Sequence, residues 1–237
     1  MTWVGANIAQ VWNLSVLHLW LSVQPIVIGF VIAVPLGLVA WRYRWLRGGL
    51  LSVIGLLYTI PSLALFVLLP PVIGISVLAD ANLVIALSIY AVALMTRFAA
   101  DAFAAVDPVV RRSAVAIGYS SWRRFWAVDL PLAGPALLAG LRVVAVSTVS
   151  LVTVGILVGI DSLGLLFTDG LQRGILAEIA TGIVMAVVIA LVLDLVIALA
   201  GRLLMPWARR PPRRRRWLPW RSSRTSARGA TAAEVAE

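Results

Sequence analysis

The chain of 237 residues contains no cysteine, and His18 is its single histidine. Without cysteine it forms neither disulfides nor thiolate metal sites, and one histidine supplies few other metal ligands. It also contains no lysine, which the phosphate-binding loop G-x-x-x-x-G-K-[ST] requires, so any ATP must be bound and hydrolysed by another chain. No grouping of histidine, cysteine or serine suggests a catalytic centre. We therefore expect a protein that is not an enzyme and that carries no metal and no other cofactor.

Charged residues are also scarce, at 13% of the chain, whereas hydrophobic residues make up 62% and the mean hydropathy is +1.00. These values are typical of membrane proteins and not of soluble domains. A hydrocarbon core about 30 Å thick requires about 20 helical residues, and long apolar runs satisfy their backbone groups in lipid only as helices. The sequence therefore predicts an all-α, multi-pass membrane protein. Five apolar runs are candidate spans: Leu19 to Trp41, Leu50 to Leu69, Asn82 to Ala99, Leu132 to Val158 and Ile175 to Leu199.

All 20 basic residues are arginine, and the formal net charge is +10. Most arginines follow the first span, separate the third span from the fourth, or follow the fifth span. With five spans, these segments share one side of the membrane, which the positive-inside rule predicts to be the cytoplasm. The N-terminus is then external and the C-terminus cytoplasmic. This placement favours contact with anionic lipid and not with nucleic acid. The arginines concerned are Arg42, Arg44 and Arg47; Arg97, Arg111, Arg112, Arg123 and Arg124; and Arg202, Arg209, Arg210 and Arg213 to Arg216.

The same pattern predicts the organisation of the chain. We expect an extracytoplasmic N-terminus at residues 1–18, a transmembrane domain at 19–204 and a basic cytoplasmic tail at 205–237. The transmembrane domain includes a cytoplasmic loop at residues 107–131. The tail is rich in proline, arginine and serine with interspersed tryptophan, a composition that favours disorder and adhesion to the inner leaflet. A regulatory or partner-binding tail is the alternative.

The loop of residues 107–131 carries the pattern of two short helices joined by a turn. Asp107 can cap a helix that starts at Pro108 and stops at Gly118, and Ser120 or Ser121 can cap a second helix. Such a unit suits docking into a groove on another protein, and an amphipathic linker along the inner leaflet is the alternative. In the second helix we expect aromatic residues on one face and arginines on the other. These residues are Trp122, Phe125 and Trp126, and Arg123 and Arg124.

The spacing around Gly118 resembles the cytoplasmic signature of permease subunits of binding-protein-dependent ABC importers. That signature reads E-A-A, three residues, G, nine residues, I, one residue, L-P, and in that family the loop couples the permease to its cytoplasmic ATPase. The matching positions here are Arg112, Ser113, Ala114, Gly118, Val128, Leu130 and Pro131, with Arg111 beside them. Arg112 stands at the glutamate position. This charge reversal suggests a co-adapted ATPase, or a second permease that carries the usual glutamate.

Four further segments are similar to permeases for quaternary-ammonium osmoprotectants such as glycine betaine, carnitine, choline and proline betaine. The segments are Val34 to Gly37, Tyr58 to Leu65, Ala139 to Arg142 and Asp161 to Leu165. The resemblance implies the type I ABC importer permease fold, with about five helices in the bacterial inner membrane. It also implies three partners: a cytoplasmic ATP-binding subunit, a second permease copy or paralogue, and an extracytoplasmic substrate-binding protein. An ABC permease for another small solute such as an amino acid, and a non-ABC channel or secondary transporter, are the alternatives.

Residues within the predicted spans are candidates for the translocation path or its gate. Pro61 interrupts the second span and frees a backbone carbonyl, so it forms either a flexing gate or a static kink. Arg142 is expected either to pack in the interior against carbonyl or carboxylate groups or to lie at the gate, and Asp194 is expected to pair with an arginine. Tyr58 offers an aromatic face to a quaternary ammonium group.

Overall fold

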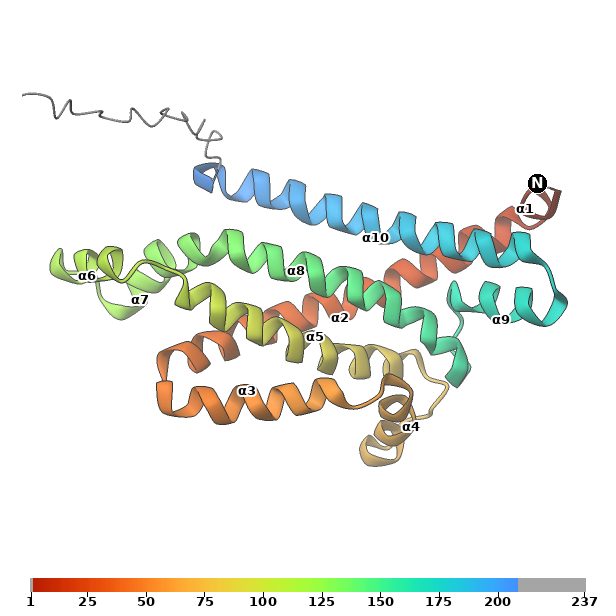
Figure 1. Cartoon of the computed structure of the whole chain (residues 1–237), viewed down its shortest axis with the longest axis horizontal. Coiled ribbons are helices and arrows are strands. Elements are labelled where there is room, and N and C mark those ends of the chain that lie inside the picture. Colours follow the sequence, from red (N-terminus) through yellow and green to blue (C-terminus); the bar gives the residue numbers. More distant parts are fainter. Residues whose placement is uncertain (1, 209–237) are drawn as a thin grey trace, which may run out of the picture.

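The computed structural model describes residues 2–208, which form helices and short connections without a β-strand (Figure 1). The α-helices are α1 (Thr2–Ala6), α2 (Ile8–Arg42), α3 (Arg44–Thr59), α4 (Ser62–Ile73), α5 (Asp80–Ala104), α6 (Pro108–Ala116), α7 (Ser121–Arg124), α8 (Leu130–Val152), α9 (Gly164–Arg173) and α10 (Leu176–Leu204). A π-helical turn, Phe125–Asp129, joins α7 to α8, and a 3-10 turn, Thr153–Val158, follows α8. A last 3-10 turn, Pro206–Ala208, follows α10.

All five predicted spans correspond to helical segments, although the boundaries of the first span differ. Four segments are each long and apolar enough to cross a membrane: Ile8–Arg42, Asp80–Ala104, Ser121–Val158 and Leu176–Leu204. The first begins at Ile8 and not near Leu19, because the stretch between them holds no proline or glycine that would end a helix. A hydropathy window locates the apolar centre of a span better than the ends of its helix.

The second predicted span, Leu50 to Leu69, is not one helix. Its two halves belong to α3 and α4, which meet at an angle of 103°. Ile60 adopts an extended conformation with ψ of 129° because it precedes Pro61, and Pro61 has no N–H to continue the helical ladder. The interruption expected at Pro61 is therefore confirmed, and the second span is a bent pair of helices and not one continuous helix.

Close contacts between helices show in which direction each one runs. A Cβ on Gly29 or Gly37 of α2 would lie 2.4 Å from the Cβ of Ala91 or Ala99 of α5, so α2 and α5 are parallel. The bent α3–α4 pair must therefore return the chain between them, as a fifth crossing does. Small residues at these positions allow the two backbones to approach closely.

The later helices alternate in direction. Gly140 of α8 lies against Phe98 of α5 and Gly155 lies against Leu83, so these helices are antiparallel. Leu138 of α8 lies against Gly201 of α10, which runs antiparallel to α8. The end of α2, the start of α3, α6, α7 and the end of α10 consequently lie at one end of the bundle (Figure 1). We call this the elbow end, after the elbow of residues 107–131.

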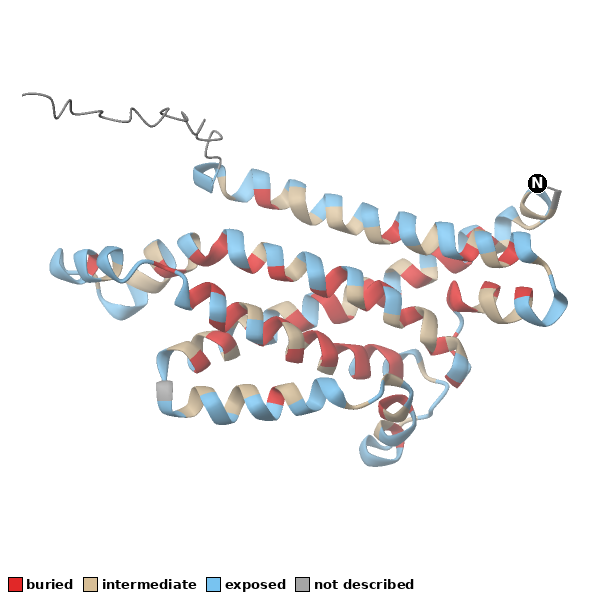
Figure 2. Cartoon of the chain, viewed as in Figure 1, coloured by how far each residue is buried: buried red, intermediate tan, exposed pale blue. Residues whose placement is uncertain are grey.

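Burial differs sharply among the long helices (Figure 2). Helix α5 lies at the centre, with 67% of its apolar window buried, whereas the value for α10 is 6%. The outward positions of α10 are apolar, as contact with lipid or another protein requires. Helix α5 is therefore the element on which α2, α3, α4 and α8 pack, whereas α10 packs mainly on α8 and α9.

The contact between α2 and α5 predicts a specific sensitivity. A Cβ at position 37 would lie 2.4 Å from Ala99 Cβ and 2.8 Å from the backbone nitrogen of Ala100. Because backbone atoms cannot move aside cheaply, we expect Gly37→Ala to destabilise the protein by about 1–3 kcal/mol. The measurement is the apparent melting temperature in detergent, followed by tryptophan fluorescence. Gly49→Ala is the matched control, because nothing lies within 4 Å of that Cβ in helix α3. Equal melting temperatures for both variants would contradict this packing.

Candidate functional site

The elbow is built from local signals that the sequence carries. The carboxylate of Asp107 accepts a hydrogen bond from Val109 N at 2.7 Å and caps α6, whose first residue is Pro108. Gly118 ends this helix with a positive φ of 88°, which glycine adopts without strain. The hydroxyl of Ser120 accepts from Arg123 N at 3.3 Å and caps α7. The predicted helix, turn and helix are therefore confirmed, with Ser120 as the second cap.

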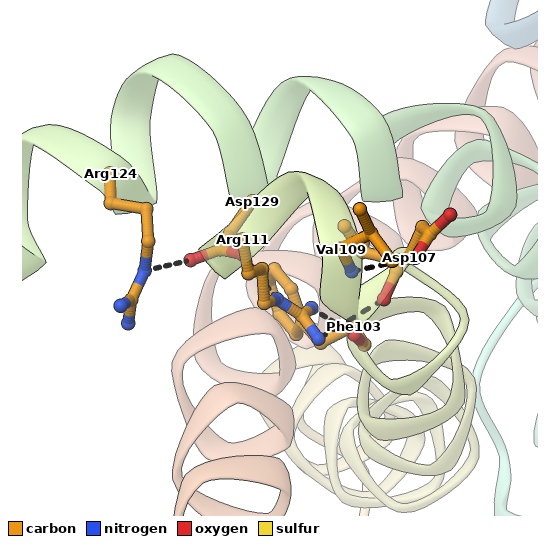
Figure 3. Close-up of polar contacts among 7 residues, drawn as sticks. Phe103, Asp107, Val109, Arg111, Arg124 and Asp129 are labelled. Carbon is orange, nitrogen blue, oxygen red and sulfur yellow. Dashed lines mark hydrogen bonds and ion pairs between the residues drawn. The ribbon is translucent and has the colours of Figure 1, made fainter. Parts of the chain in front are cut away.

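One buried carboxylate ties this unit to the bundle (Figure 3). Asp129 is 2% exposed and lies between two arginines. Arg111 Nε donates to its Oδ1 at 2.6 Å, and Arg124 Nε donates to its Oδ2 at 3.2 Å. Arg111 belongs to α6 and Arg124 to α7, whereas Asp129 is the residue before α8. The ion triad therefore fixes both elbow helices to the start of a span.

Arg111 extends this clamp to two more spans. Its guanidinium donates to the carbonyl of Val106 at 3.2 Å and to the carbonyl of Phe103 in α5. The same group lies over the ring of Trp41 in α2, 4.1 Å from the centroid. Hydrogen bonds to carbonyls and a cation–π contact offset the cost of burying the charge. We call Arg111, Arg124 and Asp129 the elbow clamp.

The aromatic side of the elbow points outward. Trp122 and Trp126 are 72% and 52% exposed, and their rings contact each other and Phe125. The expected opposite face of arginines was wrong in part, because Arg124 turns inward to Asp129. Arg123 instead stacks over the ring of Tyr119 at 4.6 Å. Exposed aromatic residues of this kind are typical of a surface that binds another protein.

The residues of the signature separate into exposed and buried positions. Arg112, Ser113 and Gly118 are exposed, Ala114 is 5% exposed, and Val128, Leu130 and Pro131 are half-buried. Within residues 2–208, no ion-pair partner of Arg112 is present. Arg112 therefore presents an unneutralised positive charge on the outer surface of α6.

The end of α10 contacts the base of the elbow. The indole Nε1 of Trp207 donates to the carbonyl of Pro131 at 3.1 Å. Met205 lies against Gly134, where a Cβ would approach its sulfur to 2.8 Å. The tail predicted at 205–237 lies outside the described residues from position 209 onward.

The break after α3 is held by a tyrosine of α5. Tyr90 donates its hydroxyl hydrogen to the carbonyl of Ile60, and its ring contacts Tyr58 edge-on at 5.7 Å. Tyr58 is 43% exposed. Because the freed carbonyl beside Pro61 has a specific donor, the bend has a defined geometry.

Arg142 and Asp194 form a two-pronged ion pair between α8 and α10. Nε and NH2 of Arg142 donate to the two carboxylate oxygens of Asp194 at 2.5 and 2.6 Å. The carboxylate partner expected for Arg142 and the arginine expected for Asp194 are therefore the same contact. The interior packing expected for Arg142 is not observed in the single chain, because the two side chains are 46% and 26% exposed. Bidentate geometry of this kind holds two helices in one register.

A groove of about 1090 Å³ lies at the elbow end between α2, α3 and α5. Its lining consists of Trp41, Arg47, Gly48, Leu51, Ser52, Gly55, Leu56, Thr59, Arg97 and Ala104. Arg97 is exposed on α5, which continues to Ala104. Sequence reasoning grouped Arg97 with the arginines that separate the third span from the fourth, although position 97 lies inside the predicted span Asn82 to Ala99, and treated it only as a marker of sidedness.

Asp129 was also missed as a functional residue. It fills the unspecified position between Val128 and Leu130 of the signature, so the spacing alone draws no attention to it. The available signal was its position as a lone acidic residue that closely follows the arginine pairs of the elbow. The structure shows that the carboxylate is the centre of the clamp.

Four long apolar helices and the bent α3–α4 pair, together with an elbow that exposes Trp122 and Trp126, define a multi-span membrane protein with a surface suited to another chain. The sequence profile of the binding-protein-dependent transport system inner membrane component matches residues 26–210. The chain belongs to this family, the membrane-spanning permeases of ABC importers. Members of the family are components of the inner membrane, and they function with ATP-binding and substrate-binding proteins in general.

Two relatives are named for the solutes they transport. The osmoprotectant import permease protein OsmW of Salmonella typhimurium is 30% identical over 76% of this chain and 84% of its own length. The glycine betaine/carnitine/choline transport system permease protein OpuCD of Bacillus subtilis is 31% identical over 71% of this chain and 70% of its own.

Solved structures agree with the fold. An inward-facing form of the MetNI methionine ABC transporter contains a chain that matches with a TM-score of 0.67. The match covers 89% of this chain and 98% of that chain at 22% identity. The type I permease architecture expected from the sequence is therefore confirmed.

The elbow clamp predicts that Asp129 is indispensable. Asp129→Asn leaves Arg111 and Arg124 in a buried site without a negative charge, which we expect to destabilise the elbow by about 3–5 kcal/mol. The measurements are resistance of the elbow to limited proteolysis and co-purification with the ATP-binding subunit, both of which should fall.

The matched control is Asp101→Asn. It breaks the ion pair of Arg47 with Asp101 at 3.0 Å, in which the side chains are 38% and 62% exposed. Exposed pairs contribute about 0–1 kcal/mol, so this variant should behave like the original chain. If Asp129→Asn and Asp101→Asn showed the same resistance to proteolysis and the same co-purification, the clamp would not be what stabilises the elbow.

Proposed function

We propose that this chain is the permease subunit of an ATP-driven importer for quaternary-ammonium osmoprotectants. The observation that carries the proposal is an outward-facing elbow with the ABC importer spacing, mounted on the bundle by the clamp. The solute class is supported by the names of the relatives OsmW and OpuCD. Glycine betaine, choline, carnitine and proline betaine are the solutes proposed.

The elbow then transmits movement from a cytoplasmic ATP-binding subunit. Trp122, Trp126 and the exposed α6 residues form the surface for that subunit. A displacement of α6 pulls on Asp129 at the start of α8 and on the contacts of Arg111 with α5 and α2. Three spans would therefore move together, because the contacts between them are ionic or hydrogen-bonded and tolerate little stretching.

The proposal places the elbow end in the cytoplasm. Arginines concentrate there at the end of α2, the start of α3, the elbow and the end of α10. The positive-inside rule then gives an external N-terminus and a cytoplasmic C-terminus. An extracytoplasmic binding protein would deliver solute at the opposite end, near α9.

A second permease chain completes the proposed assembly. The single chain leaves its groove and most of α10 exposed, whereas a path for a polar solute must be enclosed on all sides in lipid. A second copy of this chain or a paralogue would supply the missing wall.

Uptake measurements test the proposed solute class. Cells that lack the gene, grown at high osmolarity, should accumulate little labelled glycine betaine or choline, and the restored gene should recover uptake. Asp129→Asn serves as an uncoupled control, and its amount in the membrane is measured beside its uptake. Restoration of labelled methionine uptake instead, or conduction by the purified chain alone, would contradict the proposal.

The charge of Arg112 predicts the nature of its partner. If the cognate ATP-binding subunit is adapted to arginine, Arg112→Glu should weaken co-purification of that subunit on the order of tenfold, because like charges then meet. Arg112→Lys keeps the charge and should retain binding. Unchanged binding by Arg112→Glu would show that this position does not face the subunit.

A further inference from the structure

The groove at the elbow end has a lining unlike the rest of the outer surface. Small or polar residues of α3 form one stripe along it, at Gly48, Ser52, Gly55 and Thr59, with Leu51 and Leu56 beside them. These four positions recur with helical spacing and extend over about 16 Å. The stripe is therefore about as long as one membrane leaflet is thick.

Two other exposed surfaces differ from the groove lining because they are apolar: the face of α3 away from this stripe and the surface of α10. Val53 of α3 is 59% exposed and does not line the groove. The exposed side chains of α10 include Leu191 and Leu195, at 63% and 56%. Lipid-facing surfaces require such apolar side chains, whereas a water-filled cavity tolerates hydroxyls and bare backbone. The groove is thus more polar than these lipid-facing surfaces, because Arg47, Ser52, Thr59 and Arg97 contribute to its lining.

Arg97 places a positive charge in this groove. It lies on α5 seven residues before Ala104, which is about 10 Å along the helix from its end. The other arginine of the lining, Arg47, is paired with Asp101 at 3.0 Å. For Arg97, no ion-pair partner exists among residues 2–208. A guanidinium that lines a cavity and has no ion-pair partner among the described residues is available to an anionic group of a ligand.

The groove is also connected to the elbow clamp through one side chain. Trp41 lines the groove, and the guanidinium of Arg111 lies over the ring of the same tryptophan at 4.1 Å. A displacement of the elbow would therefore change the wall of the groove directly.

We propose that this groove is the elbow-end section of the solute path and that Arg97 binds the carboxylate of a zwitterionic solute. This inference rests on the proposed function and names its substrate class more closely. Glycine betaine and carnitine carry a carboxylate together with a quaternary ammonium group, whereas choline carries a hydroxyl instead. Arg97 distinguishes the first two from choline, because only a carboxylate forms the charge-assisted pair.

The absence of cysteine allows a direct test in the complete, reconstituted transporter. Ser52→Cys introduces a single thiol into the groove, and Val53→Cys introduces one into the neighbouring position outside the lining. A water-soluble thiol reagent should modify Ser52→Cys at least tenfold faster. Equal rates at the two positions would overturn the aqueous groove.

Protection by solute then tests Arg97. Saturating glycine betaine should slow modification of Ser52→Cys severalfold, and choline at the same concentration should slow it much less. Adding Arg97→Gln should abolish the protection by glycine betaine, Arg97→Lys should retain part of it, and Arg42→Gln, outside the groove, should leave it unchanged. Equal protection by the two solutes, no protection by either, or protection that survives Arg97→Gln would overturn the role of Arg97.

The thiol-modification tests can be distinguished from a failure of the proposed function. If wild-type cells import no osmoprotectant, the function proposed above is wrong, whereas the reactivity of Ser52→Cys still reports whether the groove is aqueous. If import occurs but the protection pattern is absent, only the role of Arg97 is wrong.

Discussion

The carboxylate of Asp129, held between Arg111 and Arg124, is the interaction on which the elbow depends. A buried charge is tolerated only when it is paired and hydrogen-bonded, and here one acidic residue satisfies two basic ones on separate short helices. Isolated helices as short as α6 and α7 are unstable in water, since nucleation costs more than a few hydrogen bonds return. Their positions therefore come from tertiary contacts, and the clamp supplies these contacts at the junction with α8.

The membrane imposes the second constraint. In lipid every backbone group must find an internal partner, which explains why the bend at Pro61 has a dedicated donor in Tyr90. The same requirement separates the surfaces of the bundle. Helix α10 is apolar on nearly all its outward positions, whereas the groove face of α3 carries glycine, serine and threonine beside two leucines. Sequence composition averages over both kinds of surface, and only the arrangement of the helices reveals the difference.

Prediction from sequence succeeded where the signal is local. The ends of α6 and α7 depend only on contacts between neighbouring residues. These contacts involve Asp107 before Pro108, Gly118 with its positive φ, and Ser120 before α7. It failed where the answer depended on distant partners. Arg124 was assigned to an outer face because a helical wheel contains no information about Asp129. Arg97 was treated only as a marker of sidedness because its place in the groove depends on the packing of α5 beside α2 and α3.

The amino-acid sequence by itself determined that the chain is a helical membrane protein, because its apolar runs match the thickness of a bilayer. It also determined the location of the elbow, because caps, turn glycine and spacing are short-range. Only the tertiary structure decided that α3 and α4 form a bent span, that Arg142 pairs with Asp194, and that Arg97 faces a groove while Arg111 is anchored inside the clamp. These outcomes required helices far apart in the chain to be brought side by side, and a charge is anchored or free according to which partners that packing brings within hydrogen-bonding distance.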